Sequence, residues 1–439
     1  DWLTSANIYL PNNQLPRAGE IFKNKTMAQT YNRILKDCEN HSINREQQIE
    51  HARKIWKTGF IASSIDKFCR QNYFLDSSMN KNNGILEGND LAKWSATEED
   101  PISYDYKNYS IFKTDFWGQG PCLLQQLAIL KNFDLDNYDV MSPDFIHVIV
   151  ESTKLAFADR EAFYGDPNFV KVPKEVLLSD TYNKARAELI TEKASLDVTP
   201  GKIENFGGPI IVRLKDKTDE SFSKFNLGEP TVAKFDQTNN TPLGTTSGDT
   251  THLDIIDKWG NMVSATPSGG WLQSSPIIPD LGFCLSNRAQ MFWLDENSPS
   301  CLVPGKRPRT TLSPSLALKE GKPYMVFGTP GGDQQDQWSL HLFLRHIHFD
   351  LNLQESIDAP GFNTAHFPNS FYPRETDIGS LFVERRFPKS TIKKLISKGH
   401  NVTIEDEWSL GRMTAASKNG DILKAAANPR FMQGYAIGR

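Results

Sequence analysis

The stretch Gly248–Asp257, which reads GDTTHLDIID, decides how this chain is interpreted. It follows a polar segment without a helical or strand period, and a strand-like pattern starts at its pair of threonines. A threonine hydroxyl is a poor nucleophile by itself. One way to activate it is to make that threonine the first residue of a chain, because its own α-amine is then the adjacent base. The stretch therefore predicts cleavage between Asp249 and Thr250, with Thr250 as the nucleophile.

Further motifs flank this stretch in a fixed order. They are 260–266 (GNMVSAT), 304–314 (PGKRPRTTLSP) and 328–332 (GTPGG) downstream, and 151–160 (ESTKLAFADR) and 164–167 (YGDP) upstream. Together with Thr250 they resemble the γ-glutamyltranspeptidase family of N-terminal nucleophile hydrolases. The resemblance covers nearly the whole chain and is weakest across 186–248.

The resemblance implies an α+β fold, the four-layer αββα sandwich of these hydrolases. Residues 1–249 then form the C-terminal part of the large (α) subunit, ending in a flexible linker, and residues 250–439 form the small (β) subunit. The first recognisable motif belongs to the middle of the family's large subunit, so we expect the family's N-terminal segment to be missing. Any signal peptide would lie in that segment, which leaves the location open.

The resemblance also implies a reaction. In the precursor, the Thr250 hydroxyl would attack the Asp249 carbonyl and give an ester that water hydrolyses. The freed α-amine, with a reference pKa of about 7.7–8.0, can act as a general base near neutral pH. We expect a self-processing hydrolase or transferase that acts on γ-glutamyl-type amides through an acyl-enzyme, with water or an amine as acceptor. No metal or organic cofactor is implied.

Several positions match residues that serve this chemistry in the family. Gly331 and Gly332 match its oxyanion-hole pair, and a tight turn before a helix is compatible with that role. Ser268 stands where the family has a threonine that hydrogen-bonds the nucleophile, although an ordinary loop serine remains an alternative. Thr310 and Thr311 match a serine pair that contacts the substrate carboxylate.

Two positions depart from the family in a way that concerns the substrate. Arg288 and Met291 stand where the family has a glutamine and the aspartate that binds the γ-glutamyl α-amine. Burying an ammonium group without a partner costs several kcal/mol, so Arg288 favours an acid or carbonyl-bearing substrate without that amine. A structural salt bridge is the alternative for Arg288.

The overall composition excludes some partners. The chain has 49 basic and 53 acidic side chains, and this net charge of −4 does not favour a nucleic-acid or membrane-surface partner. Its 5 cysteines are widely spaced and odd in number, which is typical of free thiols and favours a reducing, cytoplasmic-type compartment. No apolar run reaches the length of a membrane span. The expected partner is a small-molecule amide.

The spacing of apolar residues predicts secondary structure along the chain. Residues Lys154, Asp159 and Arg160 are expected either at a solvated helix surface or in structural pairs at the subunit boundary. From about 186 to 249 the composition is that of a flexible linker. Helices are predicted at 18–38, 47–70, 122–132, 143–164, 333–347 and 389–399, and strands at 109–114, 251–257, 261–266, 282–286, 324–328, 401–405 and 411–416.

Other clusters allow more than one interpretation. The spacing of His341, His346 and His348 puts them on different faces of a helix, which argues against a metal site. Trp271, Phe292 and Trp293 could line an apolar acyl pocket or pack in the core.

Two functions compete with the γ-glutamyl one. A glutaryl- or oxamate-type amide hydrolase is favoured by Arg288. A non-catalytic, unprocessed binding homologue is disfavoured because Thr250, Gly331 and Gly332 are all retained.

Overall fold

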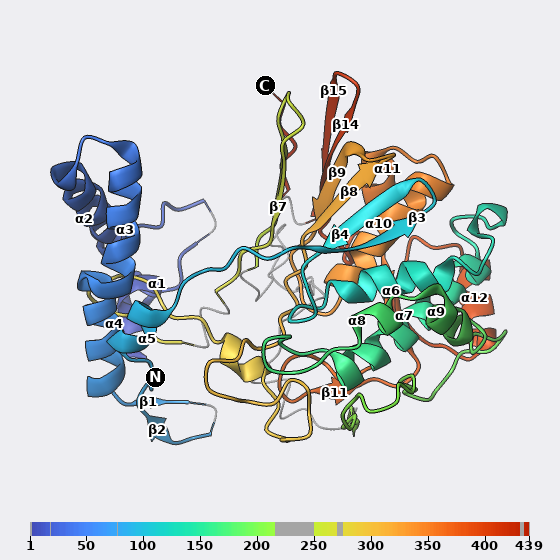
Figure 1. The fold of residues 1–439 in the computed structure, drawn as a ribbon, viewed down its shortest axis with the longest axis horizontal. Helices are drawn as coiled ribbons and strands as arrows, with labels where there is room; N and C mark the ends of the chain where they lie inside the picture. The colour runs from blue at the N-terminus through green and yellow to red at the C-terminus, as the bar shows by residue number, and fades with distance from the viewer. Residues whose placement is uncertain are drawn as a thin grey trace. The chain divides into compact units, whose positions relative to one another are not determined.

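The computed structural model of the protein describes residues 2–17, 19–76, 78–215, 250–269, 275–430 and 434–438. Two compact units are present: unit 1 comprises residues 1–99 and 269–287, and unit 2 comprises residues 100–268 and 288–439 (Figure 1). Asp249 and Trp271 lie outside the described residues, so the structure says nothing of them.

Unit 1 is built around helices with a small apolar core. A single helix was predicted over 47–70, but the extended backbone of Gly59 divides it into two. The residue there must be glycine, because a Cβ would come within 2.7 Å of the Ile55 Cα. Ile55 and Ile61 are buried on either side of this break. The elements are α1 (Leu3–Tyr9), η1 (Pro11–Asn13), α2 (Lys25–His41), α3 (Arg45–Thr58), α4 (Phe60–Gln71), β1 (Phe74–Leu75), β2 (Lys81–Asn82) and α5 (Gly88–Lys93).

Residues 275–287 join unit 1 through side-chain hydrogen bonds. Asn24 Nδ2 donates to the Gly282 carbonyl (2.7 Å), and Thr30 Oγ1 donates to the Leu281 carbonyl (3.0 Å). The strand predicted at 282–286 is wrong, since only an isolated bridge between Ile277 and Cys284 forms. The segment is apolar because Ile278 and Leu281 fill the helical core, and not because it belongs to a sheet.

A six-stranded antiparallel sheet forms the centre of unit 2. Its strand order is β15-β14-β9-β8-β4-β3. Strands β4 and β9 are mostly buried, which explains the apolar runs that predicted them. The strands are β3 (Ile102–Tyr106), β4 (Tyr109–Lys113), β8 (Ser315–Lys319), β9 (Lys322–Gly328), β14 (Thr414–Asn419) and β15 (Ile422–Ala427).

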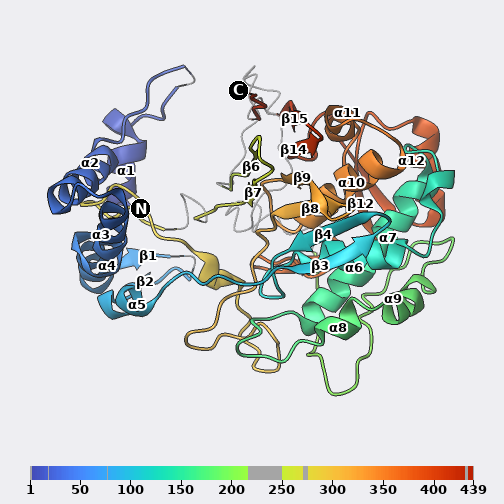
Figure 2. The same ribbon diagram turned by 45° about the horizontal axis from the view of Figure 1, so that its top comes forward.

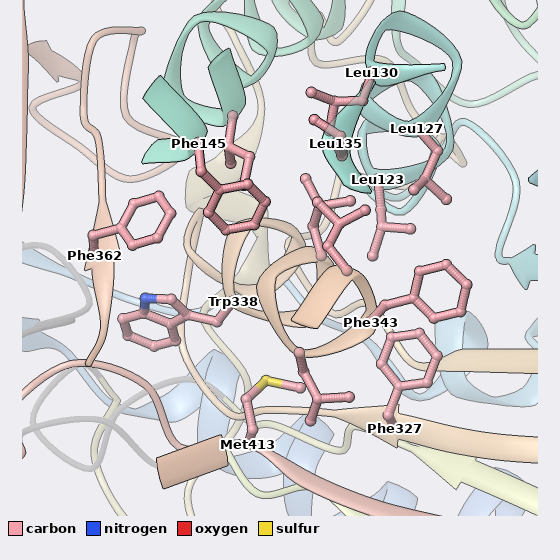
Figure 3. Close-up of a cluster of buried hydrophobic side chains, with 14 of the residues drawn as sticks. Leu123, Leu127, Leu130, Leu135, Phe145, Phe327, Trp338, Phe343, Phe362 and Met413 are labelled. Atoms are coloured by element: carbon pink, nitrogen blue, oxygen red, sulfur yellow. The ribbon is translucent and has the colours of Figure 1, made fainter. Parts of the chain in front are cut away.

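Helices cover one face of this sheet and form the main apolar core with it. Helices α6 (Pro121–Leu130), α7 (Pro143–Phe163) and α10 (Gln335–His348) confirm the predictions within a few residues. Figure 3 shows Leu123 and Leu127 of α6 near Phe343 of α10, with Phe327 of β9 beside them. Phe327 and Phe343 stack with their ring centroids 5.9 Å apart.

The hairpin of β6 (Leu253–Ile256) and β7 (Met262–Ala265) packs against β8, β9 and β14. It lies on the side of the sheet away from the helices (Figure 2). Consecutive side chains of a strand point to opposite faces. Phe327 accordingly faces the helical core, while a Cβ on Gly328 would face His252 beside the hairpin. Unit 2 thus presents a helical layer, a sheet and a second β layer.

Smaller elements surround this framework. Within the described residues, every helix falls short of the length and apolarity needed to cross a membrane. The remaining elements are η2 (Leu135–Asn137), α8 (Lys174–Leu177), α9 (Asp180–Ala187), β5 (Arg213–Leu214), η4 (Arg288–Met291), α11 (Leu353–Asp358), β10 (Phe362–Asn363), β11 (Glu375–Thr376), β12 (Ser380–Glu384), α12 (Lys389–Lys398) and β13 (Asn401–Glu405).

The segment after α9 differs from the prediction of a flexible linker. Its backbone is held by buried polar side chains of α7: Ser195 N donates to Glu151 Oε2 (3.0 Å), and Gly201 N donates to Asp159 Oδ1 (2.6 Å). β5 then pairs in parallel with β11. Because these backbone groups bond to side chains, the segment needs no periodic pattern of its own. The part of the predicted linker at 216–249 lies outside the described residues.

The charged residues of α7 are buried and paired. Lys154 Nζ lies 2.6 Å from Glu151, Arg186 Nη2 lies 3.1 Å from Asp159, and Arg160 Nη1 lies 2.5 Å from Asp333. Of the two alternatives for these residues, structural pairing is confirmed and solvation is wrong. The Arg160–Asp333 pair joins the two sides of the predicted cleavage point.

Candidate active site

The structure brings Thr250, Ser268 and Arg288 together. Thr250 lies three residues before β6 and Ser268 three residues after β7, and a bond from Thr251 N to the Pro267 carbonyl (3.1 Å) extends the pairing of the two strands towards them. Thr250 Oγ1 donates to Ser268 Oγ at 3.1 Å, and Arg288 Nη2 donates to the same Ser268 oxygen. A guanidinium group is therefore only two hydrogen bonds away from the predicted nucleophile.

Arg288 begins the short helix η4, whose last residue is Met291. Its Nη1 also approaches Met291 Sδ at 3.8 Å, and Met291 is only 2% exposed. The two positions that depart from the family pattern are thus in contact with each other. A cation and an apolar thioether occupy this place, instead of an amide and a carboxylate.

The glycine turn lies between β9 and α10. Gly331 has φ 133°, a conformation that favours glycine. The two carbonyls of the turn accept hydrogen bonds from neighbouring residues of the chain. Gln335 Nε2 donates to the Gly331 carbonyl, and Gln119 Nε2 (3.3 Å) and Gln335 N (3.1 Å) donate to the Gly332 carbonyl. Among the described residues, the N–H groups of Gly331 and Gly332 have no hydrogen-bond acceptor, so they are available to a ligand.

His252 connects the start of strand β6, which follows Thr250, to the end of β9, which precedes this turn. A Cβ at Gly328 would lie 2.3 Å from His252 Cε1, so the ring rests directly on the backbone at the end of β9. His252 Nδ1 bonds to Thr266 Oγ1 (2.7 Å), and Nε2 bonds to Asp254 (3.0 Å). These contacts fix the ends of β6, β7 and β9 relative to one another.

The buried ion pair of Arg160 and Asp333 stabilises the glycine turn, since Asp333 directly follows Gly332. Asp333 accepts hydrogen bonds from Arg160, and Ser370 donates to it through both its N–H (2.9 Å) and its hydroxyl (2.5 Å). Burial alone would raise the pKa of Asp333, but the charge of Arg160 and these hydrogen bonds hold that pKa below its usual value. Arg160 Nη1 also donates to Gln119 Oε1 (2.9 Å), so the same cation orients the amide that binds Gly332.

The two threonines predicted to bind a substrate carboxylate are in different states. Thr310 Oγ1 accepts from Leu312 N (3.2 Å), and the Thr310 backbone pairs with that of Trp117 and Gln119. Thr311 Oγ1 is buried and has no hydrogen-bond partner within the described ranges. Of the pair, Thr311 therefore has the unused hydroxyl. The recorded contacts do not link either hydroxyl to Thr250, and their role stays a prediction.

The predicted aromatic pocket is only partly described. Trp293 is buried under the Arg374 guanidinium, which lies 4.4 Å from its ring centroid. Its backbone forms an isolated β-bridge with that of Cys301. Its place is therefore in the core, the second of the two alternatives. Phe292 is half-buried, and its carbonyl accepts from Arg374 (2.7 Å).

The three predicted non-ligand histidines each have a separate environment. His341 stacks on Phe362 (3.9 Å between centroids), His346 Nε2 bonds to Tyr324 (2.6 Å), and His348 Nδ1 bonds to Asp136 (2.6 Å). A different cluster of potential metal ligands was not predicted from the sequence.

That cluster comprises His147, Glu151 and His400, whose ligand atoms lie within 4.8 Å of one another. Lys154 already provides its cation, since Nζ lies 2.6 Å from Glu151. The two imidazoles bond to each other (His147 Nδ1 to His400 Nε2, 2.8 Å). The cluster is thus a buried network in which Lys154 is paired with Glu151, while His400 Nδ1 has no hydrogen-bond partner within the described residues.

Sequence reasoning missed Gln119, Gln335 and His252, although His252 lies within the stretch 248–257 and Gln335 lies three residues after the motif 328–332. In the sequence these residues are only polar side chains, and the structure shows that all three side chains are buried. Burial cannot be read from residue type, because glutamine and histidine occur at surfaces as well as in interiors.

A threonine at the start of a β hairpin, on a sheet covered by helices on its other face, is the arrangement of an N-terminal nucleophile hydrolase with the αββα fold. The chain belongs to the γ-glutamyltranspeptidase family: the family profile described as Gamma-glutamyltranspeptidase matches residues 1–438.

Relatives with known names fall into two groups. The glutathione hydrolase proenzyme of Escherichia coli (strain K12) is 28% identical over 375 residues, which are 82% of this chain and 56% of that protein. The acylase ACY 1 proenzyme of Pseudomonas sp. (strain SE83) is 28% identical over 349 residues, which are 79% of this chain and 53% of that protein. The chain thus spans little more than half the length of these relatives.

Solved structures agree with the fold. The structure of LmbA2991HD has a TM-score of 0.87 and 45% sequence identity, and the match covers 100% of this chain and 72% of that one. Cephalosporin acylase from Bacillus halodurans has a TM-score of 0.74 and 26% identity, covering 98% of this chain and 66% of that one.

Proposed function

We propose that this protein is a self-processing threonine amide hydrolase that prefers an acyl group bearing an acid or carbonyl over one bearing a free α-amine. The observation that carries the substrate preference is the contact of Arg288 with Ser268, whose oxygen also accepts from Thr250.

Processing and turnover would use the same atoms. Thr250 Oγ attacks the Asp249 carbonyl, the C–N bond breaks, and water hydrolyses the resulting ester to leave the Thr250 amine free. In turnover, Oγ attacks the substrate amide while the α-amine takes its proton, and the amine product leaves with that proton. The N–H groups of Gly331 and Gly332 would stabilise the oxyanion. Water, or an amine, then releases the acyl group.

The charge of Arg288 supports this preference between acyl groups. Two like charges about 5 Å apart repel by about 3 kcal/mol at an effective dielectric constant of about 20. A substrate ammonium placed beside Arg288 would meet such a repulsion, whereas a carboxylate or carbonyl would gain a donor. Glutaryl- and oxamate-type amides meet this requirement. Two of the similar proteins are named acylases, which supports an amide hydrolase that removes an acyl group.

A γ-glutamyl amide is the second candidate. It is favoured by the glutathione hydrolase proenzyme of Escherichia coli, which is 28% identical to this chain over 375 residues. In that case the ammonium would need a partner other than position 291, because Met291 offers none.

The full-length protein should be tested against matched γ-glutamyl, glutaryl and oxamyl amides, beside two single variants. Thr250→Ala should abolish turnover and leave the chain intact by mass spectrometry. Thr251→Ala, which removes the adjacent hydroxyl but keeps the backbone bond to Pro267, should still release the piece 250–439 and turn over substrate. Turnover by Thr250→Ala, or an intact chain in an active wild-type sample, would refute the mechanism.

A further inference from the structure

The peptide group between Gly331 and Gly332 is held from one side by a single buried amide. Gln335 Nε2 donates to the Gly331 carbonyl, and Gln335 is 0% exposed. A trans peptide is planar, with its C=O and N–H pointing in opposite directions. The hydrogen bond to the Gly331 carbonyl therefore also sets the direction of the Gly332 N–H.

The amide of Gln335 has one defined orientation. Its Oε1 accepts from Ser313 N at 3.0 Å, while its Nε2 faces the Gly331 carbonyl. Flipping the amide would oppose donor to donor and acceptor to acceptor. Ser313 is itself anchored, because its Oγ donates to Asp336 Oδ1 at 2.6 Å, and Asp336 pairs with Lys113 at 3.0 Å. A rigid chain of contacts thus ends at the turn.

The turn would be loose without this contact. Gly331 has a conformation that few other residues adopt, and two successive glycines leave the intervening peptide free to rotate. An oxyanion donor is effective because it is oriented before the reaction, so that no reorganisation is needed in the transition state. Orientation of the Gly332 N–H is thus a separate requirement from the presence of the glycine.

We propose that Gln335 is a positioning residue that aims the Gly332 N–H at the oxyanion. The inference rests on the proposed function, in which Gly331 and Gly332 form the oxyanion hole. It assigns to Gln335 an effect on the transition state, mediated by the Gly331 carbonyl, and no contact with substrate.

The test compares two variants that each replace a buried glutamine by an apolar side chain of similar length. Gln335→Met removes the donor to Gly331. Gln125→Met is the matched control: Gln125 lies on α6 and is also 0% exposed, and its Nε2 donates to Asp159 Oδ2 (2.5 Å) on α7. Rates are expressed per mole of chain that mass spectrometry shows to be processed and circular dichroism shows to be folded.

The expected result is a split between kcat and KM. In Gln335→Met, kcat should fall about 10- to 100-fold with KM little changed, since a misdirected donor loses part of the roughly 10²–10³-fold effect of a complete one. Gln125→Met should lose thermal stability while its kcat per folded, processed chain stays at the wild-type value. Equal losses of kcat in both variants, or an unchanged kcat in Gln335→Met, would overturn the inference.

A second variant covers the case in which Gln335→Met does not fold or process. In Gln335→Glu, an ionised carboxylate repels the Gly331 carbonyl, whereas the protonated acid can donate to it. Burial raises a carboxyl pKa, so the ratio of variant to wild-type kcat should rise as the pH is lowered from about 8 to about 6. A ratio that stays constant or falls would contradict the inference. If the wild type shows no amide hydrolase activity, or if Thr250→Ala is active, the proposed function is refuted instead.

Discussion

The imidazole of His252 rests on the Cα of Gly328, where an added methyl group would lie 2.3 Å from Cε1 and 2.6 Å from Nε2. This contact joins the strand that begins beside Thr250 to the strand that ends beside the Gly331–Gly332 turn. The ring cannot move away easily, because Thr266 and Asp254 bond to its two nitrogens. The geometry of the candidate site therefore depends on the absence of one side chain.

Gly328→Ala should destabilise the protein by about 1–3 kcal/mol, as overpacking of a closed interior does, and should lower kcat. In a His252→Ala background the same substitution should cost much less, because the ring it collides with is gone. Denaturant unfolding of the four proteins of this cycle measures the coupling. Gly88→Ala is the control, since its Cβ would meet only ordinary contacts near 3.7 Å. Additive effects would show that the collision is relieved elsewhere.

Gly332→Val should reduce turnover by about 10²–10³-fold, because the branched side chain would displace the backbone N–H of residue 332 from the oxyanion. Folding should change less than activity, which circular dichroism and thermal unfolding can check. Wild-type kinetics in a well-folded Gly332→Val protein would remove Gly332 from the oxyanion hole.

Met291→Asp should shift the preference of the enzyme towards γ-glutamyl amides. Arg288 Nη1 already approaches Met291 Sδ, so a carboxylate there would offset the guanidinium charge and offer the substrate ammonium a partner. A charged hydrogen bond of this kind contributes on the order of 1–3 kcal/mol. The measurement is kcat/KM for paired glutaryl and γ-glutamyl amides, with Met291→Leu as the uncharged control. A strong wild-type preference for γ-glutamyl amides that Met291→Asp leaves unchanged would place the amine elsewhere.

The protein should lose stability as the pH falls from about 6.5 towards 4. Burial, with the nearby charge of Lys154, lowers the pKa of His366 from its usual value near 6.5 to about 4. In that window the unfolded chain binds a proton that the folded chain does not, so the stability present above pH 6.5 is progressively lost, by up to about 3 kcal/mol. Urea unfolding across this range would measure the slope.

His366→Gln is the matching variant. The neutral ring donates to the Asp197 carbonyl (3.2 Å) and accepts from Gly379 N (2.7 Å), and an amide can replace one of these bonds without titrating. Its stability should therefore fall less steeply with acid than that of the wild type. Parallel curves would show that His366 does not contribute.

Much of the fold could be predicted because it follows local rules. Helices α6, α7 and α10 form along long segments rich in apolar residues and are almost wholly buried, and Ser142 and Pro143 mark the start of α7. The strand predicted at 282–286 failed because a short apolar run fits a helical core as well as a sheet. The prediction of a flexible linker was wrong for residues 191–201, because this part bonds to α7 side chains distant in sequence.

The sequence by itself determined the family, the candidate nucleophile Thr250 and the glycine pair, since each is a residue type that the chemistry requires within a short motif. Only the tertiary structure decided that Arg288 reaches Ser268, that His252 rests on Gly328 and that Gln335 orients the glycine turn. The physical reason is that these relations depend on the direction and burial of side chains from segments far apart in the chain. Packing, and not local pattern, sets those directions.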